Sequence, residues 1–134
     1  MKHFCKTLCI FLAVVAIVIL AGCVQSKVRI KWQGTNVPGH MAYRYDRFTG
    51  DAETHNVSVK AGQTLVLTYD VVVNEGTLSI QVDGPDNEAV WEIALQEGAQ
   101  DTVELALEEG GQYCVVVMGE KTGGSFDVSW ELRD

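Results

Sequence analysis

Hydrophobic and polar residues alternate with a period of two through most of the chain, and helical periodicity is almost absent after the first 26 residues. In residues 125–132, Phe126, Val128 and Trp130 share one face, while serine and acidic residues share the other. Such alternation is typical of strands with one face on a core. It predicts further strands at residues 28–32, 55–59, 77–83 and 102–107.

Three other segments add to this pattern. Residues 65–73 and 113–118 are apolar on both faces, which is typical of central strands that are covered on both sides. Residues 88–95 indicate a strand rather than a short helix, because the alternate residues Ala89, Trp91, Ile93 and Leu95 then share a face. Residues 34–40 show no clear alternation and are expected to form a loop.

Turn signals separate these segments at regular distances. Strands with turn signals about every 8–12 residues predict an all-β fold, here a single antiparallel β-sandwich, jelly-roll-like and of about seven to nine strands, in residues 27–134. The signals are Lys60-Ala61-Gly62-Gln63, Asn74-Glu75-Gly76, Asp83-Gly84-Pro85-Asp86-Asn87, Glu97-Gly98, Gly110-Gly111 and Gly123-Gly124.

The inward phases of the strands predict the core. On the first strand they turn Ile30 and Trp32 inward, and Lys27, Arg29 and Lys31 outward. The other expected core residues are Val57, Val59, Leu65, Leu67, Leu78, Ile80, Val82, Val103, Leu105, Val115, Val117, Phe126, Val128 and Trp130.

The start of the chain has a different pattern. A short basic segment precedes an uncharged apolar stretch at residues 8–21, which is short for a bilayer span of about 20 residues. The motif Leu20-Ala21-Gly22-Cys23 that follows resembles the lipobox of bacterial lipoproteins. The resemblance implies a helical signal peptide at 1–22, a lipidated anchor and short tether at 23–26, and lipid on Cys23. The alternative is a transmembrane helix that ends by chance at a cysteine.

This resemblance places residues 27–134 outside the cytoplasm, held to the cell membrane by two acyl chains. Beyond residue 22 the chain has 8 basic and 18 acidic residues, a net charge of −10. Such a surface is a poor match for the phosphates of nucleic acids, so we expect no nucleic-acid partner. Cys114 is then left without a disulfide partner, and stability depends on the hydrophobic core.

The order of strands and turns in residues 54–132 carries a second resemblance. Its main features are the Lys60-Ala61-Gly62-Gln63 turn, Gly111-x-Tyr113 and Gly123-Gly124-Ser125-Phe126. This order is similar to small Gram-positive-type lipoproteins and to the jelly-roll sandwiches of bacterial pre-peptidase C-terminal domains and Golgi-dynamics (GOLD) domains. The resemblance implies an extracellular binding or accessory role.

Catalytic chemistry has little support in the sequence. Only His40 and His55 are available as histidine bases after the leader, and no serine lies in a Gly-x-Ser-x-Gly motif. Cys114 lies in an apolar strand, where a thiol is usually inert. We therefore expect no enzyme and no cofactor.

Metal binding has one weak candidate. Asp83, Asp86 and Glu88 surround a turn and offer the oxygen ligands that calcium takes. The same residue types also stabilise tight turns through bonds to their own backbone, and the spacing matches no calcium motif. The two histidines match no transition-metal pattern, so the sequence predicts no metal site beyond this candidate.

Two surfaces remain as candidates for binding. Tyr43, Arg44 and Tyr45 form a mixed aromatic and basic segment that favours a ligand surface, or else an ordinary strand with half-buried tyrosines. The outward residues Lys27, Arg29 and Lys31 lie within eight residues of Cys23 and favour contact with anionic headgroups, or else they protect an edge strand.

The sequence thus predicts a membrane-tethered, extracytoplasmic lipoprotein that acts as a non-enzymatic binding or interaction module. The alternative is a structural envelope lipoprotein that works through protein contacts. An envelope protein or a carbohydrate is the expected partner besides the membrane.

Overall fold

Eight strands, all paired antiparallel, make up the computed structural model, which describes residues 27–52 and 54–134. None of these residues forms a helix able to cross a membrane. The strands are β1 (Val28–Ile30), β2 (Gln33–Val37), β3 (His40–Asp51), β4 (His55–Val59), β5 (Thr64–Asp83), β6 (Ala89–Leu95), β7 (Ala99–Ala106) and β8 (Gly111–Arg133).

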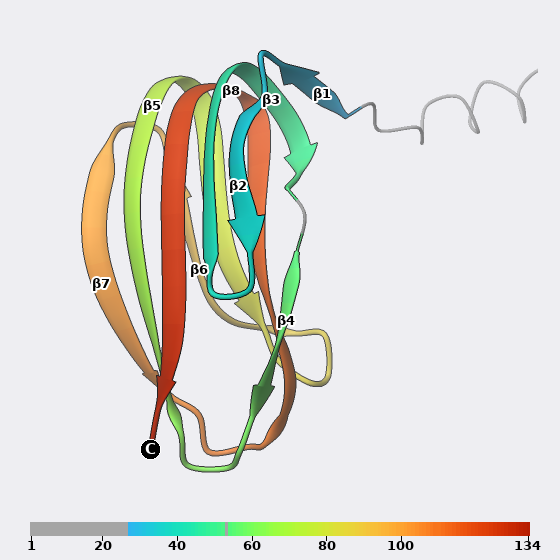
Figure 1. The fold of residues 1–134 in the computed structure, drawn as a ribbon, viewed down its shortest axis with the longest axis vertical. Coiled ribbons are helices and arrows are strands. Elements are labelled where there is room, and N and C mark those ends of the chain that lie inside the picture. The colour runs from blue at the N-terminus through green and yellow to red at the C-terminus, as the bar shows by residue number, and fades with distance from the viewer. Residues whose placement is uncertain (1–26, 53) are drawn as a thin grey trace, which may run out of the picture.

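One hydrogen-bonded network folds into two layers because its long strands bend over at one end (Figure 1). Residues 124–133 of β8 pair with β3 and with the first half of β5, which also pairs with β7. Residues 111–119 of β8 pair with β4 and with the second half of β5, which also pairs with β6. This arrangement confirms the predicted antiparallel β-sandwich.

We name the two layers by their strand order. The front sheet runs β2-β3-β8-β5-β7, and the back sheet runs β4-β8-β5-β6. The end at which β3, β5 and β8 cross between them is the bend end, and β1 lies there against the last residues of β3. Figure 1 shows the C-terminus at the opposite end of the molecule.

Two glycine-rich segments that were predicted as turns are in fact bends inside continuous strands. The ladder between β5 and β8 shifts register around Glu75 and then continues into the other layer. Gly76 and Gly124 have φ of 68° and 136°, a region that side chains disfavour, so glycine permits the bend. The separate strands expected on either side of each segment are therefore single strands of 20 and 23 residues.

The loop expected at residues 34–40 was also wrong. β2 forms a hairpin with β3 through the two-residue turn of Pro38 and Gly39, and Gly39 has a φ of 87°. β2 lies at the edge of the front sheet, and most of its residues are exposed. An edge strand without a buried face leaves no hydrophobic alternation to detect in the sequence.

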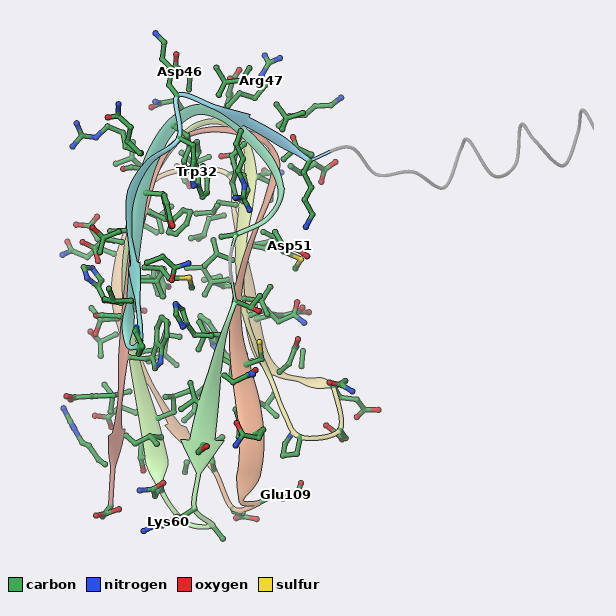
Figure 2. All side chains as sticks on the ribbon, turned by 45° about the vertical axis from the view of Figure 1, so that its right-hand side comes forward. Trp32, Asp46, Arg47, Asp51, Lys60 and Glu109 are labelled. Carbon is green, nitrogen blue, oxygen red and sulfur yellow. The ribbon has the colours of Figure 1, made fainter. Side chains whose placement is uncertain are left out.

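The core fills the space between the layers. Every residue that the strand phases predicted for it beyond β1 is buried or packs against buried residues, as Trp130 does. On the first strand, Trp32 packs against the core near the bend end (Figure 2), whereas Ile30 is 46% exposed. Lys31 has a φ of 55°, which breaks the alternation after β1 and explains why Ile30 does not follow the predicted phase.

Candidate binding groove

The registers of the front sheet place its outward side chains in rows across the strands. Arg44 of β3, Ser125 of β8 and Val72 of β5 are paired in the first row, and Gln33 of β2 extends it. Because residues alternate between faces, the next outward row lies two positions further along each strand. That second row contains Thr35, Ala42, Asp127 and Asp70.

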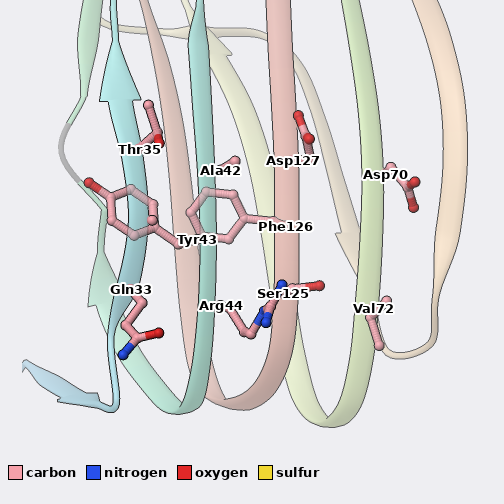
Figure 3. Close-up of a pocket in the computed structure, with 11 residues that line it drawn as sticks. Gln33, Thr35, Ala42, Tyr43, Arg44, Asp70, Val72, Ser125, Phe126 and Asp127 are labelled. Carbon is pink, nitrogen blue, oxygen red and sulfur yellow. The ribbon is translucent and has the colours of Figure 1, made fainter.

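These two rows line a groove of about 500 Å³ on the outer face of the front sheet (Figure 3). Its floor includes two small apolar side chains, Ala42 and the 48% exposed Val72. Phe126 also borders the groove, but its side chain is 1% exposed and belongs to the core. The full lining is Gln33, Gly34, Thr35, Ala42, Tyr43, Arg44, Asp70, Val72, Ser125, Phe126 and Asp127.

Most polar side chains of the groove are unpaired. Within residues 27–52 and 54–134, no hydrogen bond or ion pair engages the side chains of Gln33, Thr35, Arg44, Asp70 or Ser125. They offer both donors and acceptors to a ligand.

Two carboxylates lie opposite each other in the second row. Asp70 and Asp127 are cross-strand partners, and such partners have Cβ atoms about 5 Å apart. Like charges in this position destabilise a sheet. His40 Nε2 lies 2.8 Å from Asp127 Oδ1 at an exposed site, while the Asp70 carboxylate has no partner among the described residues. A ligand that donates hydrogen bonds here would relieve this repulsion.

The candidate surface at residues 43–45 divides between the two faces of β3. Arg44 is exposed and lines the groove, as a ligand-binding residue must. Tyr43 stacks on Trp32 with ring centroids 4.2 Å apart, and it is only partly buried. Tyr45 is 4% exposed and lies in the core, so the expectation that it joins a ligand surface was wrong. Its inward phase on β3 is the physical reason.

The sequence did not identify most of the groove. In the sequence, five groove residues have the same pattern as ordinary solvent-facing residues of a strand. They are Gln33, Thr35, Asp70, Ser125 and Asp127. Only the pairing of β2, β3, β8 and β5 brings them to one surface. The weak signal that was present is Asp70, a lone charge inside the otherwise apolar 65–73 segment.

The basic residues beside β1 lie at the bend end rather than at the groove. Arg29 donates from Nη2 to the Asp51 carbonyl at 2.6 Å, and its guanidinium lies 4.8 Å from the ring centroid of Trp32. Lys31 Nζ lies 3.3 Å from an Asp46 carboxylate oxygen. Arg29 therefore also holds β1 in place, while Lys27 is exposed. Cys23 and the predicted signal and tether lie outside the described residues.

Two carboxylates of the weak calcium candidate form hydrogen bonds with neighbouring residues. Asp86 Oδ1 accepts a hydrogen bond from the Glu88 backbone N–H at 3.2 Å, and Asp83 Oδ1 accepts one from Gln81 at 2.5 Å. In the part of the chain that the structure describes, no three His, Cys, Asp or Glu residues are grouped to hold a metal ion.

His55 is half-buried, as its inward phase predicted. Its Nε2 forms a hydrogen bond with Asn36 Oδ1, and its ring packs 5.6 Å from that of Trp130. Through these contacts His55 connects the two layers, which is a structural role.

Comparison with known proteins gives fold neighbours only. No protein-family model and no curated protein matches the chain. A carbohydrate-binding module of Cellvibrio mixtus lichenase 5A, solved with cellotriose, is 15% identical, with 82% of this chain and 90% of that chain covered and a TM-score of 0.46.

Two other solved structures are also similar to this chain. The C-terminal domain of EclA, a sugar-binding protein, is 11% identical, with 84% and 86% covered and a TM-score of 0.41. A periplasmic inhibitor of g-type lysozyme from Aeromonas hydrophila is 20% identical, with 72% and 92% covered and a TM-score of 0.39.

Proposed function

We propose that this protein is a non-enzymatic binding domain that takes a neutral, hydroxyl-rich ligand, an oligosaccharide, in the groove on the front sheet. One observation carries the proposal: the groove gathers polar side chains from four strands, and most of them have no partner within the described chain. Buried or bound polar groups need hydrogen-bond partners, and hydroxyl groups supply both donors and acceptors.

The chemistry of the groove favours a neutral ligand over an anionic one. Its lining carries one positive charge, on Arg44, and two negative charges, on Asp70 and Asp127, so it has both donors and acceptors and a net charge of −1. Bidentate hydrogen bonds to charged side chains orient neighbouring hydroxyls. The small apolar side chains of Ala42 and Val72 leave room for the C–H surface of a sugar ring.

Protein contact through an apolar patch has less support. The large hydrophobic side chains that are exposed lie on four different strands, and Val72 among them belongs to the groove. These side chains are Ile30, Val37, Val72 and Val90.

The test uses the full-length protein in detergent micelles. An array of neutral oligosaccharides identifies a ligand, and calorimetry then measures its dissociation constant. Replacing Asp70 by Asn should weaken binding about tenfold or more, because a hydrogen bond to a charged group contributes about 1.5–3 kcal/mol.

The matched control is Glu92→Gln, which removes an exposed carboxylate from β6 in the back sheet. We expect this variant to bind like the unmodified protein. Absence of any oligosaccharide ligand, or equal losses in Asp70→Asn and Glu92→Gln, would exclude the groove as a carbohydrate site.

Membrane attachment belongs to the same proposal and is supported by the lipobox-like motif at Cys23. Lys27 lies four residues after this cysteine, and the described chain enters the sandwich at the bend end through β1. In this attachment, Lys27, Arg29 and Lys31 would face the lipid headgroups. The groove would then lie on the side of the sandwich, with its row of Arg44 and Ser125 nearest the bend end.

A further inference from the structure

A second hollow lies on the same outer face, next to the groove. It has a volume of about 290 Å³ and is lined by Val66, Thr68, Ser129, Trp130 and Glu131. Nothing in the proposed function uses it. Its outward side chains come from β5 and β8, the two central strands that also carry Asp70 and Asp127.

The register makes the hollow a direct continuation of the groove. Ser129 pairs with Thr68 in the third outward row, next to the Asp127 and Asp70 row. Glu131 pairs with Val66 in the fourth row. Each row lies two residues beyond the last, about 6.8 Å, so the four rows extend over roughly 20 Å along the strands.

The junction between the two hollows has polar sides. His40 lies beside Ser129 on β3 and reaches diagonally to Asp127, with Nε2 2.8 Å from Oδ1. On the other side, the Thr68 and Thr102 hydroxyls lie 3.2 Å apart. Ser129 lies between them, and its hydroxyl makes no hydrogen bond within the described residues.

The far end of the second hollow is walled by charged groups. Arg133 lies 3.4 Å from Glu104 and 3.1 Å from Glu131, and these acids flank Val66 on the two neighbouring strands. Val66 points outward yet is only 5% exposed. The hollow thus repeats the composition of the groove, with polar sides and an apolar floor.

We propose that the groove and the second hollow form one linear site for an extended chain of several sugar units, running along β5 and β8 rather than across the sheet. This inference rests on the proposed function and deepens it. Thr68 and Ser129 form the second subsite, and ligand length sets the affinity because only a longer chain reaches both.

The experiment uses the full-length protein and a series of oligosaccharides, from one to six units, of the type that binds best on the array. Affinity should rise by about tenfold or more with length and then level off, since only units that reach the second subsite add hydrogen bonds. In Ser129→Tyr, a ring covers the second subsite, and long ligands should bind only as well as short ones. Binding of the short ligands should not change.

Ser79→Tyr is the matched control, because Ser79 is also half-exposed on the outer face of a central strand, in the back sheet. It should leave the length dependence intact. The linear site would be overturned if affinity did not depend on ligand length, if Asp70→Asn still weakened binding and if Ser129→Tyr left binding unchanged. The groove would then remain the binding site. If no oligosaccharide of any length binds, both the proposed function and this inference fail.

Discussion

Two hydroxyl groups inside the sandwich, those of Tyr45 and Thr122, have no hydrogen-bond partner in the described structure. Both residues lie near the bend end, where β3 and β8 cross between layers. A buried hydroxyl without a partner costs about 1–3 kcal/mol, because it gives up water and gains nothing in return. The hydroxyl of Tyr113 differs, since it donates to the Glu109 carbonyl at 2.6 Å.

Substitution of these two tyrosines by phenylalanine should therefore have opposite effects. Tyr45→Phe removes an unpaired hydroxyl and should raise the free energy of unfolding by about 1 kcal/mol. Tyr113→Phe removes a hydrogen bond and should lower it by about the same amount. Urea denaturation of both variants measures the difference. Destabilisation of both to the same extent would show that the Tyr45 hydroxyl has a partner.

The same residue links stability to alkaline pH. Burial raises the pKa of Tyr45 from 10.0 to about 12, and the Thr122 hydroxyl, which can donate to the phenolate once Tyr45 loses its proton, opposes this rise. Between pH 10 and 12 the unfolded chain loses this proton while the folded chain retains it, so stability falls as pH rises. The slope from this group approaches about 1.4 kcal/mol per pH unit, and Tyr45→Phe should lack it.

Burial also raises the pKa values of Tyr69 and Tyr113, with nearby carboxylates adding to the rise. These two tyrosines contribute alkaline slopes of their own, so Tyr45→Phe should reduce the dependence on pH without abolishing it. Denaturation curves at pH 9, 10 and 11 compare the variant with the unmodified protein.

At the scale of single residues, the sequence predicted burial better than it predicted the site. Inward phases identified Val128 and Leu78 correctly because hydrophobicity itself marks them. The groove residues have no such mark, since a serine such as Ser125 has the same local pattern whether it faces bulk water or a ligand. Their function depends on neighbours from other strands, which local periodicity does not contain.

Among the elements, the bends of β5 and β8 decide how the sheet becomes a sandwich. A Cβ added at Gly76 would overlap the carbonyl oxygens of Glu120 and Lys121 in the opposite bend. Gly76 also has a φ of 68°, so it meets both a conformational and a steric demand. Gly62 has a φ of 90°, but nothing lies within 4 Å of its added Cβ.

Alanine substitutions at these two glycines should separate the two demands. Gly62→Ala should cost about 1 kcal/mol from backbone strain alone. Gly76→Ala should cost at least about 3 kcal/mol, because the two bends must also move apart. Thermal unfolding followed by circular dichroism measures both. Equal costs would show that β5 and β8 do not pack closely at the bend.

Element boundaries were predictable only in part. Alternation located β4, β6 and β7 to within a few residues, but Asn74-Glu75-Gly76 was interpreted as a turn. Turns and sharp bends demand the same residues, because both need positive φ and little side-chain bulk. Whether a chain reverses or continues past such a point is decided by its partner strands.

For the whole molecule, basic residues gather at the bend end, where we propose that the protein is attached to the membrane. Figure 2 shows Arg47 and Asp46 there, with Lys60 and Glu109 at the opposite end. Five of the eight basic residues beyond residue 22 lie on β1, beside it or in the bends. They are Lys27, Arg29, Lys31, Arg47 and Lys121.

Lipid attachment at Cys23 is the prediction at this scale. Expressed in a bacterium fed labelled palmitate, the protein should carry label and enter the detergent phase on partition, because two acyl chains anchor stably. Cys23→Ser should lose the label. The control Cys114→Ser changes the free thiol of β8 and should retain it. Label that persists in Cys23→Ser would refute the lipoprotein prediction.

The fold class was predictable from the sequence, but the sharing of β3, β5 and β8 between the two layers was not. Period-two alternation sufficed for an antiparallel β-sandwich, because each strand hides one face. The shared strands depend on long-range pairing between residues such as Thr64 and Arg133, which no local signal encodes.

The central position of β8 has a consequence for how the protein is made. This strand is the last in the described chain and the only one that pairs with β3, β4 and β5. During synthesis the earlier strands emerge first, and until residues 111–133 follow they can pair only in two separate groups, β1 and β2 with β3, and β6 and β7 with β5. Neither sheet is complete before that point, because β8 joins β3, β4 and β5. Until then the newly made chain exposes unpaired strand edges, which chaperones can protect from aggregation.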